Sequence, residues 1–131
     1  MRQTKRSTLI KNLDTIFSKY IRTKYSKNGM VECVTCKRQY EISKIQNGHF
    51  ISRKHYATRW DEENVAPQCY GCNVMKYGEQ FLFSKWIEQT YGEGKADELL
   101  QRSREVVKFS DYELKEMIEL YKQKYMQLES R

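Results

Sequence analysis

The chain lacks long apolar segments, internal repeats and regions of low complexity. Of its 131 residues, 31% are charged and 39% are hydrophobic, and the mean hydropathy is −0.87. No stretch approaches the roughly 20 apolar residues that a transmembrane helix requires. Charged and polar residues also interrupt the first 22 positions, so that segment does not resemble a secretory signal. We therefore expect an intracellular protein of the cytoplasm that makes no membrane contact.

Acidic residues are nearly missing from the N-terminal segment. Residues 1–29 contain eight Lys and Arg against Asp14 alone, whereas residues 30–79 and 80–131 are close to neutral. A surface with this bias attracts polyanions, because contacts to phosphate dominate non-specific affinity for nucleic acids. A solvated helix face on a basic protein is the alternative explanation of the same charge. The basic side chains expected to contact DNA in this segment are Lys5, Arg6, Lys11 and Lys19.

The length predicts one domain over residues 1–131, and the apolar spacing predicts that it is mostly helical. Apolar residues recur at three- and four-residue steps from Leu9 to Tyr25, which predicts a basic N-terminal helix within residues 1–29. Helices are also expected at 80–91, from about 95 to 107, and after Ser110, where Ser110 and Glu113 are spaced as a capping box. Residues 30–79 form the irregular centre, and residues 80–131 form the C-terminal helices.

Four cysteines occur as two C-x2-C pairs within the centre. Cys33 and Cys36 form the first pair, and Cys69 and Cys72 form the second. Two such knuckles supply four thiolates, the ligand set of a tetrahedral structural zinc site with no open position for substrate. A redox C-x-x-C does not need two copies, and four unrelated buried cysteines are the remaining alternative. We expect one structural Zn²⁺ per chain.

One histidine and two asparagines are threaded through these knuckles in the order H-x14-N-x8-N. They are His49, Asn64 and Asn73, the last directly after Cys72. With its surroundings, this pattern resembles the zinc-containing HNH endonucleases, and most closely the NinG/Rap family of phage recombination endonucleases. Endonuclease VII-like resolvases are more distantly similar. The resemblance is clearest from residue 30 to 92 and rests on Cys33-Val-Thr-Cys36, Gly48-His49-Phe50, Arg59-Trp60, Glu63-Asn64, Gln68-Cys69-Tyr-Gly-Cys72-Asn73 and Gly78.

The resemblance implies an α+β, mostly helical fold with a ββα-metal module. In this module two strands carry His49 and Asn64, and the following helix presents Asn73. His49 would then deprotonate the attacking water, and Asn64 would hold the loop and the strand by hydrogen bonds. The amide oxygen of Asn73 would bind a catalytic Mg²⁺ or Mn²⁺. Arg53, Lys54 and Arg59 would face DNA, although each is equally explained as a solvated loop charge.

Gly48 departs from the family pattern, because many HNH enzymes carry a metal-binding side chain directly before the catalytic histidine. Either Asn73 holds the ion with water, phosphate and another residue, or His49 is the ligand and a different group is the base. His55 is the candidate for that second arrangement, with a surface role as its alternative.

Three functions compete on this basis. The first is a metal-dependent endonuclease for duplex or branched DNA, encoded by a phage or prophage and active in its bacterial host. The second is a zinc module that binds nucleic acid without catalysis, which Gly48 favours. The third, a zinc-organised protein-interaction domain, leaves His49, Asn64 and Asn73 unexplained. Cutting two strands of a branched junction would suit a homodimer.

Overall fold

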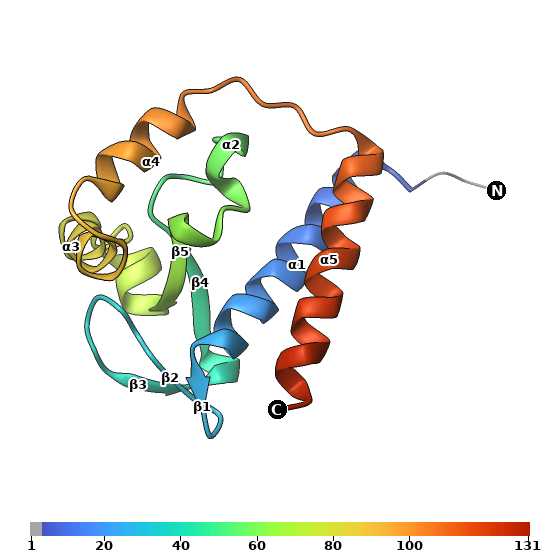
Figure 1. Cartoon of the computed structure of the whole chain (residues 1–131). Coiled ribbons are helices and arrows are strands. Elements are labelled where there is room, and N and C mark those ends of the chain that lie inside the picture. The colour runs from blue at the N-terminus through green and yellow to red at the C-terminus, as the bar shows by residue number, and fades with distance from the viewer. Residues whose placement is uncertain (1–3) are drawn as a thin grey trace.

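The computed structural model describes residues 4–131 and shows two long helices packed beside a small mixed module (Figure 1). The α-helices are α1 (Arg6–Lys24), α2 (Tyr56–Arg59), α3 (Gln80–Tyr91), α4 (Lys95–Ser103) and α5 (Asp111–Glu129). The strands are β1 (Ser26–Lys27), β2 (Met30–Glu32), β3 (Gln39–Glu41), β4 (Ile45–His49) and β5 (Val65–Cys69). Three short helical turns are η1 (Ile42–Lys44), η2 (Glu62–Asn64) and η3 (Gly71–Met75).

Helices α1 and α5 lie side by side and run in the same direction (Figure 1). Near their starts, Arg6 pairs with Asp111 at 3.1 Å, and further along the ring centroids of Phe17 and Tyr121 are 4.9 Å apart. The apolar stripe predicted from Leu9 onward is buried in this interface. The apolar faces of the two terminal helices therefore meet within one chain.

Glu62 fastens this helix pair to the module. Its half-buried carboxylate accepts hydrogen bonds from Lys124 at 2.9 Å and from the Tyr121 hydroxyl at 3.2 Å, both on α5. It also accepts from Tyr20 and Lys24 of α1, each at 3.3 Å. Burial opposes ionisation of Glu62, but the neighbouring ammonium groups lower its pKa below the usual value. One carboxylate thus joins three separate parts of the chain.

Two antiparallel sheets make up the module. Strands β1, β2 and β3 form the first, and β4 pairs with β5 in the second, from Ile45 opposite Cys69 to His49 opposite Val65. A second core cluster surrounds the knuckles, and a third lies between the β5 region and helices α3 and α4. The α+β, mostly helical fold with two knuckles is therefore confirmed.

The predicted elements match the structure with three differences. Asn64 does not lie on a strand, because it ends η2 one residue before β5 begins. The helix that presents Asn73 is the five-residue π-helical turn η3. Helix α4 ends at Ser103 rather than near residue 107, since Val106 is fully exposed and has no apolar contact to stabilise a further turn. The capping box of Ser110 and Glu113 is confirmed at the start of α5. Within residues 4–131, no helix is long and apolar enough to cross a membrane.

Candidate functional site

The four cysteines converge between the two sheets. The sulfur atoms of Cys33, Cys36, Cys69 and Cys72 all lie within 4.8 Å of one another, and those of Cys36 and Cys69 are 3.8 Å apart. Four sulfurs bound about 2.3 Å from a zinc ion lie roughly 3.8 Å apart at the corners of a tetrahedron. The donor set and its spacing therefore fit one structural Zn²⁺.

Backbone donors around the knuckles favour the thiolate form that metal binding requires. The Cys72 amide donates to Cys69 Sγ at 3.4 Å, and the Thr35 hydroxyl lies 3.4 Å from Cys33 Sγ. Burial opposes ionisation of Cys33, but hydrogen bonds from nearby backbone amides and from Thr35 lower its pKa to about 6. Burial instead raises the pKa of Cys36, and it raises the pKa of Cys72 to about 12. Cys33 is thus prepared as a thiolate, whereas a metal ion would have to displace the protons of Cys36 and Cys72 as it binds.

His49 is the last residue of strand β4, and one of its ring nitrogens is hydrogen-bonded to the backbone. Its Nε2 lies 2.9 Å from the backbone oxygen of Arg59. A carbonyl oxygen can only accept, so Nε2 carries the proton in the neutral ring and Nδ1 carries the free lone pair. Burial lowers the pKa of His49 to about 4, which keeps the imidazole neutral at cytoplasmic pH. His49 thus offers Nδ1 as a base or a metal ligand.

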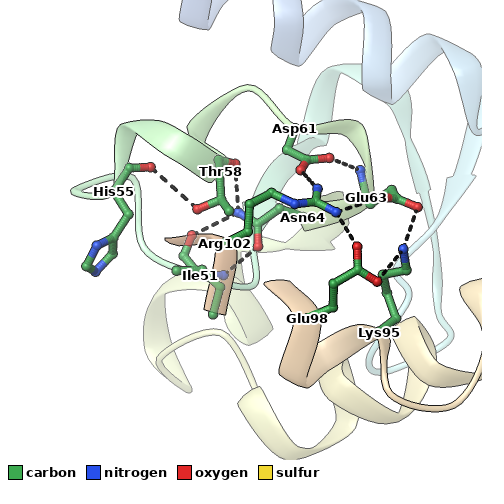
Figure 2. A network of polar contacts seen from close by, with 9 residues as sticks. All are labelled: Ile51, His55, Thr58, Asp61, Glu63, Asn64, Lys95, Glu98 and Arg102. Carbon is green, nitrogen blue, oxygen red and sulfur yellow. Dashed lines mark hydrogen bonds and ion pairs between the residues drawn. The ribbon is translucent and has the colours of Figure 1, made fainter. Parts of the chain in front are cut away.

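Asn64 is completely buried and holds the loop that follows His49. Its Oδ1 accepts from the Ile51 amide at 2.9 Å, and its Nδ2 donates to the carbonyls of Ile51 and Thr58, each at 3.0 Å (Figure 2). Its own carbonyl accepts from Phe50 at 2.8 Å. These bonds tie the start of the loop at Ile51 and the α2 residue Thr58 to one side chain.

Charged residues of α4 hold the turn that carries Asn64. Arg102 is paired with Asp61 and lies 3.6 Å from Glu63, while Lys95 pairs with Glu63 and Glu98, both at 3.1 Å (Figure 2). Asp61 also accepts a hydrogen bond from the Glu63 amide. Helix α4 therefore holds the Asn64 turn in place, and it also packs against α2 in the loop between β4 and β5.

Asn73 and His49 line the same hollow, which has a volume of about 650 Å³. Asn73 Nδ2 donates to Gln46 Oε1 at 2.8 Å, which leaves its Oδ1 as an acceptor. Arg53 and Arg22 also line the hollow. The histidine that ends β4, an amide oxygen and two guanidinium groups thus line one space.

Packing explains the missing side chain at position 48. A Cβ on Gly48 would lie 2.1 Å from Oε1 of Gln68, which is buried and bonded through Nε2 to Thr35 and to the Gly78 carbonyl. No larger residue fits unless Gln68 moves. Within residues 4–131, the four cysteines are the only group of three or more His, Cys, Asp or Glu arranged to hold a metal. Asp14 is the only carboxylate that lines the hollow, and its oxygens accept hydrogen bonds from Arg59 and Trp60, so a divalent ion there would have few charged ligands.

The remaining predicted residues are spread around this hollow. His55 and Lys54 are exposed on the loop and do not line it. The Arg59 guanidinium is bound by Asp14, with Nε at 3.1 Å and Nη2 at 2.5 Å, instead of projecting outward. Arg53 lies 3.9 Å from the same carboxylate.

On α1, the exposed side chains of Lys5, Lys11 and Lys19 contrast with Arg6, which is paired with Asp111. The structure adds Asp14 and Arg22 to the residues that line the hollow. Asp14 is the only acid of residues 1–29, and that exception to the charge pattern marks it in the sequence.

One family model matches the chain. It is described as Bacteriophage Lambda NinG protein, and it covers residues 2–131. No curated protein and no solved structure gives a significant match. The similarity thus extends beyond the knuckles and includes both terminal helices.

Replacing one knuckle cysteine should remove the metal and unfold the centre. For Cys72→Ser we expect loss of the single zinc ion in elemental analysis, because three thiolates cannot close the tetrahedron. Met75→Ser is the matched control, since Met75 is 69% exposed in the same turn. Zinc-free wild-type protein with unchanged thermal unfolding would contradict a structural metal.

Protonation of His49 should destabilise the fold at acid pH. The unfolded chain protonates this residue near pH 6.5 and the folded chain only near pH 4, so its stabilising effect is complete above pH 6.5 and is lost as the pH falls. Between pH 7 and pH 5 we expect wild type to lose about 2 kcal/mol more than His49→Gln in urea unfolding. Parallel pH profiles for the two proteins would count against a buried neutral imidazole.

Proposed function

The chain belongs to the NinG family of phage proteins, and we propose that it is a metal-dependent DNA endonuclease of the HNH type. Its substrate is duplex or branched DNA handled during phage or prophage recombination in the cytoplasm of a bacterial host. A homodimer would provide the two cuts that a branched junction needs.

One observation carries this proposal. His49 and Asn73 are 24 positions apart in the sequence, yet both line one hollow together with Arg53. The loop between β4 and β5 is held by the buried Asn64. A structural zinc module alone does not require a histidine with a free Nδ1 beside an amide oxygen.

Hydrolysis in this hollow would use the free lone pair on Nδ1 of the neutral His49 ring. Nδ1 takes a proton from water, the resulting hydroxide oxygen bonds to phosphorus, and the bond from phosphorus to the leaving oxygen breaks. The leaving oxygen takes a proton from solvent, and His49 later releases its own proton to solvent. The Arg59 carbonyl stabilises the charged ring through Nε2–H, and an approaching phosphate raises the pKa of His49 toward the working pH. Asn73 Oδ1 would be one ligand of a bound Mg²⁺ or Mn²⁺, which would stabilise the negative charge on the phosphate oxygens.

A second function is favoured by Gly48. Because Gln68 excludes any side chain at that position, the hollow has fewer hard ligands than a typical HNH site. The alternative is a zinc module that binds nucleic acid through the same basic surfaces without cutting it. Catalysis and binding are separated by the two experiments that follow.

Cleavage should depend on His49 and on a divalent metal. We expect supercoiled plasmid and a synthetic four-way junction to be cut in Mg²⁺ or Mn²⁺, and His49→Ala to lower the rate at least 100-fold by removing the base. His55→Ala is the matched control, because His55 is exposed and lies outside the hollow. Circular dichroism and zinc content verify that both variants fold. DNA binding without cleavage in every divalent metal tested would favour the alternative.

Neutralising the exposed basic side chains of α1 should weaken DNA binding in a salt-dependent way. For Lys5→Gln, Lys11→Gln and Lys19→Gln combined, we expect the slope of log affinity against log salt to fall by about two to three, since each phosphate that a lysine neutralises adds about 0.9 to it. Lys115→Gln with Lys122→Gln on α5 is the control for general charge. Equal slopes for the two sets would assign the α1 charges to solvent.

A further inference from the structure

Arg22 of helix α1 is a half-buried cation beside the candidate catalytic residues. It follows Asp14 and Ser18 at four-residue steps, so one face of α1 presents these three polar residues toward β4. All three line the hollow that contains His49 and Asn73. Sequence spacing places Arg22 only among the basic residues of an amphipathic helix.

The Arg22 guanidinium is fixed in place by neutral acceptors only. Nε donates to the Ser18 carbonyl at 3.3 Å and to the Ser18 hydroxyl at 3.2 Å, and Nη1 donates to the Ile42 carbonyl at 3.2 Å. Within residues 4–131, Nη2 has no hydrogen-bond partner, and no carboxylate lies within 4.0 Å of the group. The charge of Arg22 is therefore not neutralised by a carboxylate, and its Nη2 donors remain free for a ligand.

Two other arginines near the module are neutralised by carboxylates. Arg59 is paired with Asp14, and Arg102 is paired with Asp61. Asp14 lines the same hollow, but its oxygens already accept from Arg59 and from the Trp60 indole. The one carboxylate on the α1 face therefore does not neutralise Arg22.

Burial of an unpaired cation has a cost that an anionic ligand removes. Desolvation lowers the pKa of Arg22, which shows that the environment disfavours its charge. A planar guanidinium with free Nη donors matches the oxygens of a phosphate in a bidentate arrangement. Its three existing hydrogen bonds hold that group in position before any ligand arrives.

We propose that Arg22 binds the non-bridging oxygens of a DNA phosphodiester group in the hollow, and so presents the phosphorus to His49 and Asn73. This inference rests on the proposed function, because it assigns the hollow to the substrate phosphate. Helix α1 then supplies a substrate-binding residue in addition to exposed lysines that attract DNA from a distance.

The test measures DNA binding and cleavage separately. Binding of a fluorescent 20-base-pair duplex is measured by anisotropy in EDTA, where no cleavage occurs, for wild type, Arg22→Gln, Arg22→Lys and the control Lys122→Gln. We expect Arg22→Gln to bind about tenfold more weakly or worse, with the salt slope reduced by about one. The DNA affinity of Arg22→Lys should lie between those of wild type and Arg22→Gln. The affinity of Lys122→Gln should equal that of wild type. In Mg²⁺ or Mn²⁺, added guanidinium should partly restore cleavage by Arg22→Ala but not by His49→Ala.

The outcomes distinguish the two proposals. If no protein cleaves DNA but Arg22→Gln still loses affinity and salt dependence, the endonuclease assignment fails and the phosphate contact stands. Wild-type binding and cleavage by folded Arg22→Gln would overturn the inference while leaving the endonuclease intact. If Arg22→Gln does not fold, Arg22→Lys decides, because unchanged binding and cleavage in that variant would exclude a bidentate guanidinium contact.

Discussion

The register between β4 and β5 determines the geometry of both candidate sites. At one end of this pairing, Ile45 lies opposite Cys69 in the knuckle region, and at the other His49 lies opposite Val65, next to Asn64. A shift of one residue would move every side chain to the other face of the sheet. The cysteine cluster therefore anchors one end of the ribbon, and the hydrogen bonds of Asn64 anchor the other. The cysteine cluster thus supports the hollow through the two strands between them.

Helices α1 and α5 complete a site that the zinc module cannot build alone. The module leaves one side of the hollow open, and α1 closes it with Asp14 and Arg22. Helix α5 does not line the hollow, but it covers the apolar side of α1 and shares Glu62 with it. Asp14 adds a connection of its own, since it binds the side chain of Arg59, whose carbonyl orients His49. Helix α1, supported by α5, thus closes the hollow on one side of the β4–β5 pair.

Local patterns in the sequence predict the parts whose determinants lie close together along the chain. The paired cysteines, the capping box at Ser110 and the periodic apolar face of α1 are of this kind, and the structure agrees with each. The small sheet of β1, β2 and β3 has strands of two or three residues, too short to produce a periodic pattern. The partners of Asp14 and Gly48 are 45 and 20 positions away along the chain, at Arg59 and Gln68. Such contacts depend on how the helices and strands pack, so spacing does not predict them.

Because Gly48 and Gln68 are in contact, a larger residue at position 48 requires a substitution at position 68 as well. A carboxylate at position 48, the ligand that many HNH sites use, has no room until residue 68 becomes shorter. Shortening Gln68 first would remove its bonds to Thr35 beside Cys33 and to the Gly78 carbonyl. The shortest mutational path to a stronger metal ligand therefore passes through a variant with a weakened knuckle. A carboxylate at position 48 would therefore be introduced at the expense of contacts that support the cysteine cluster.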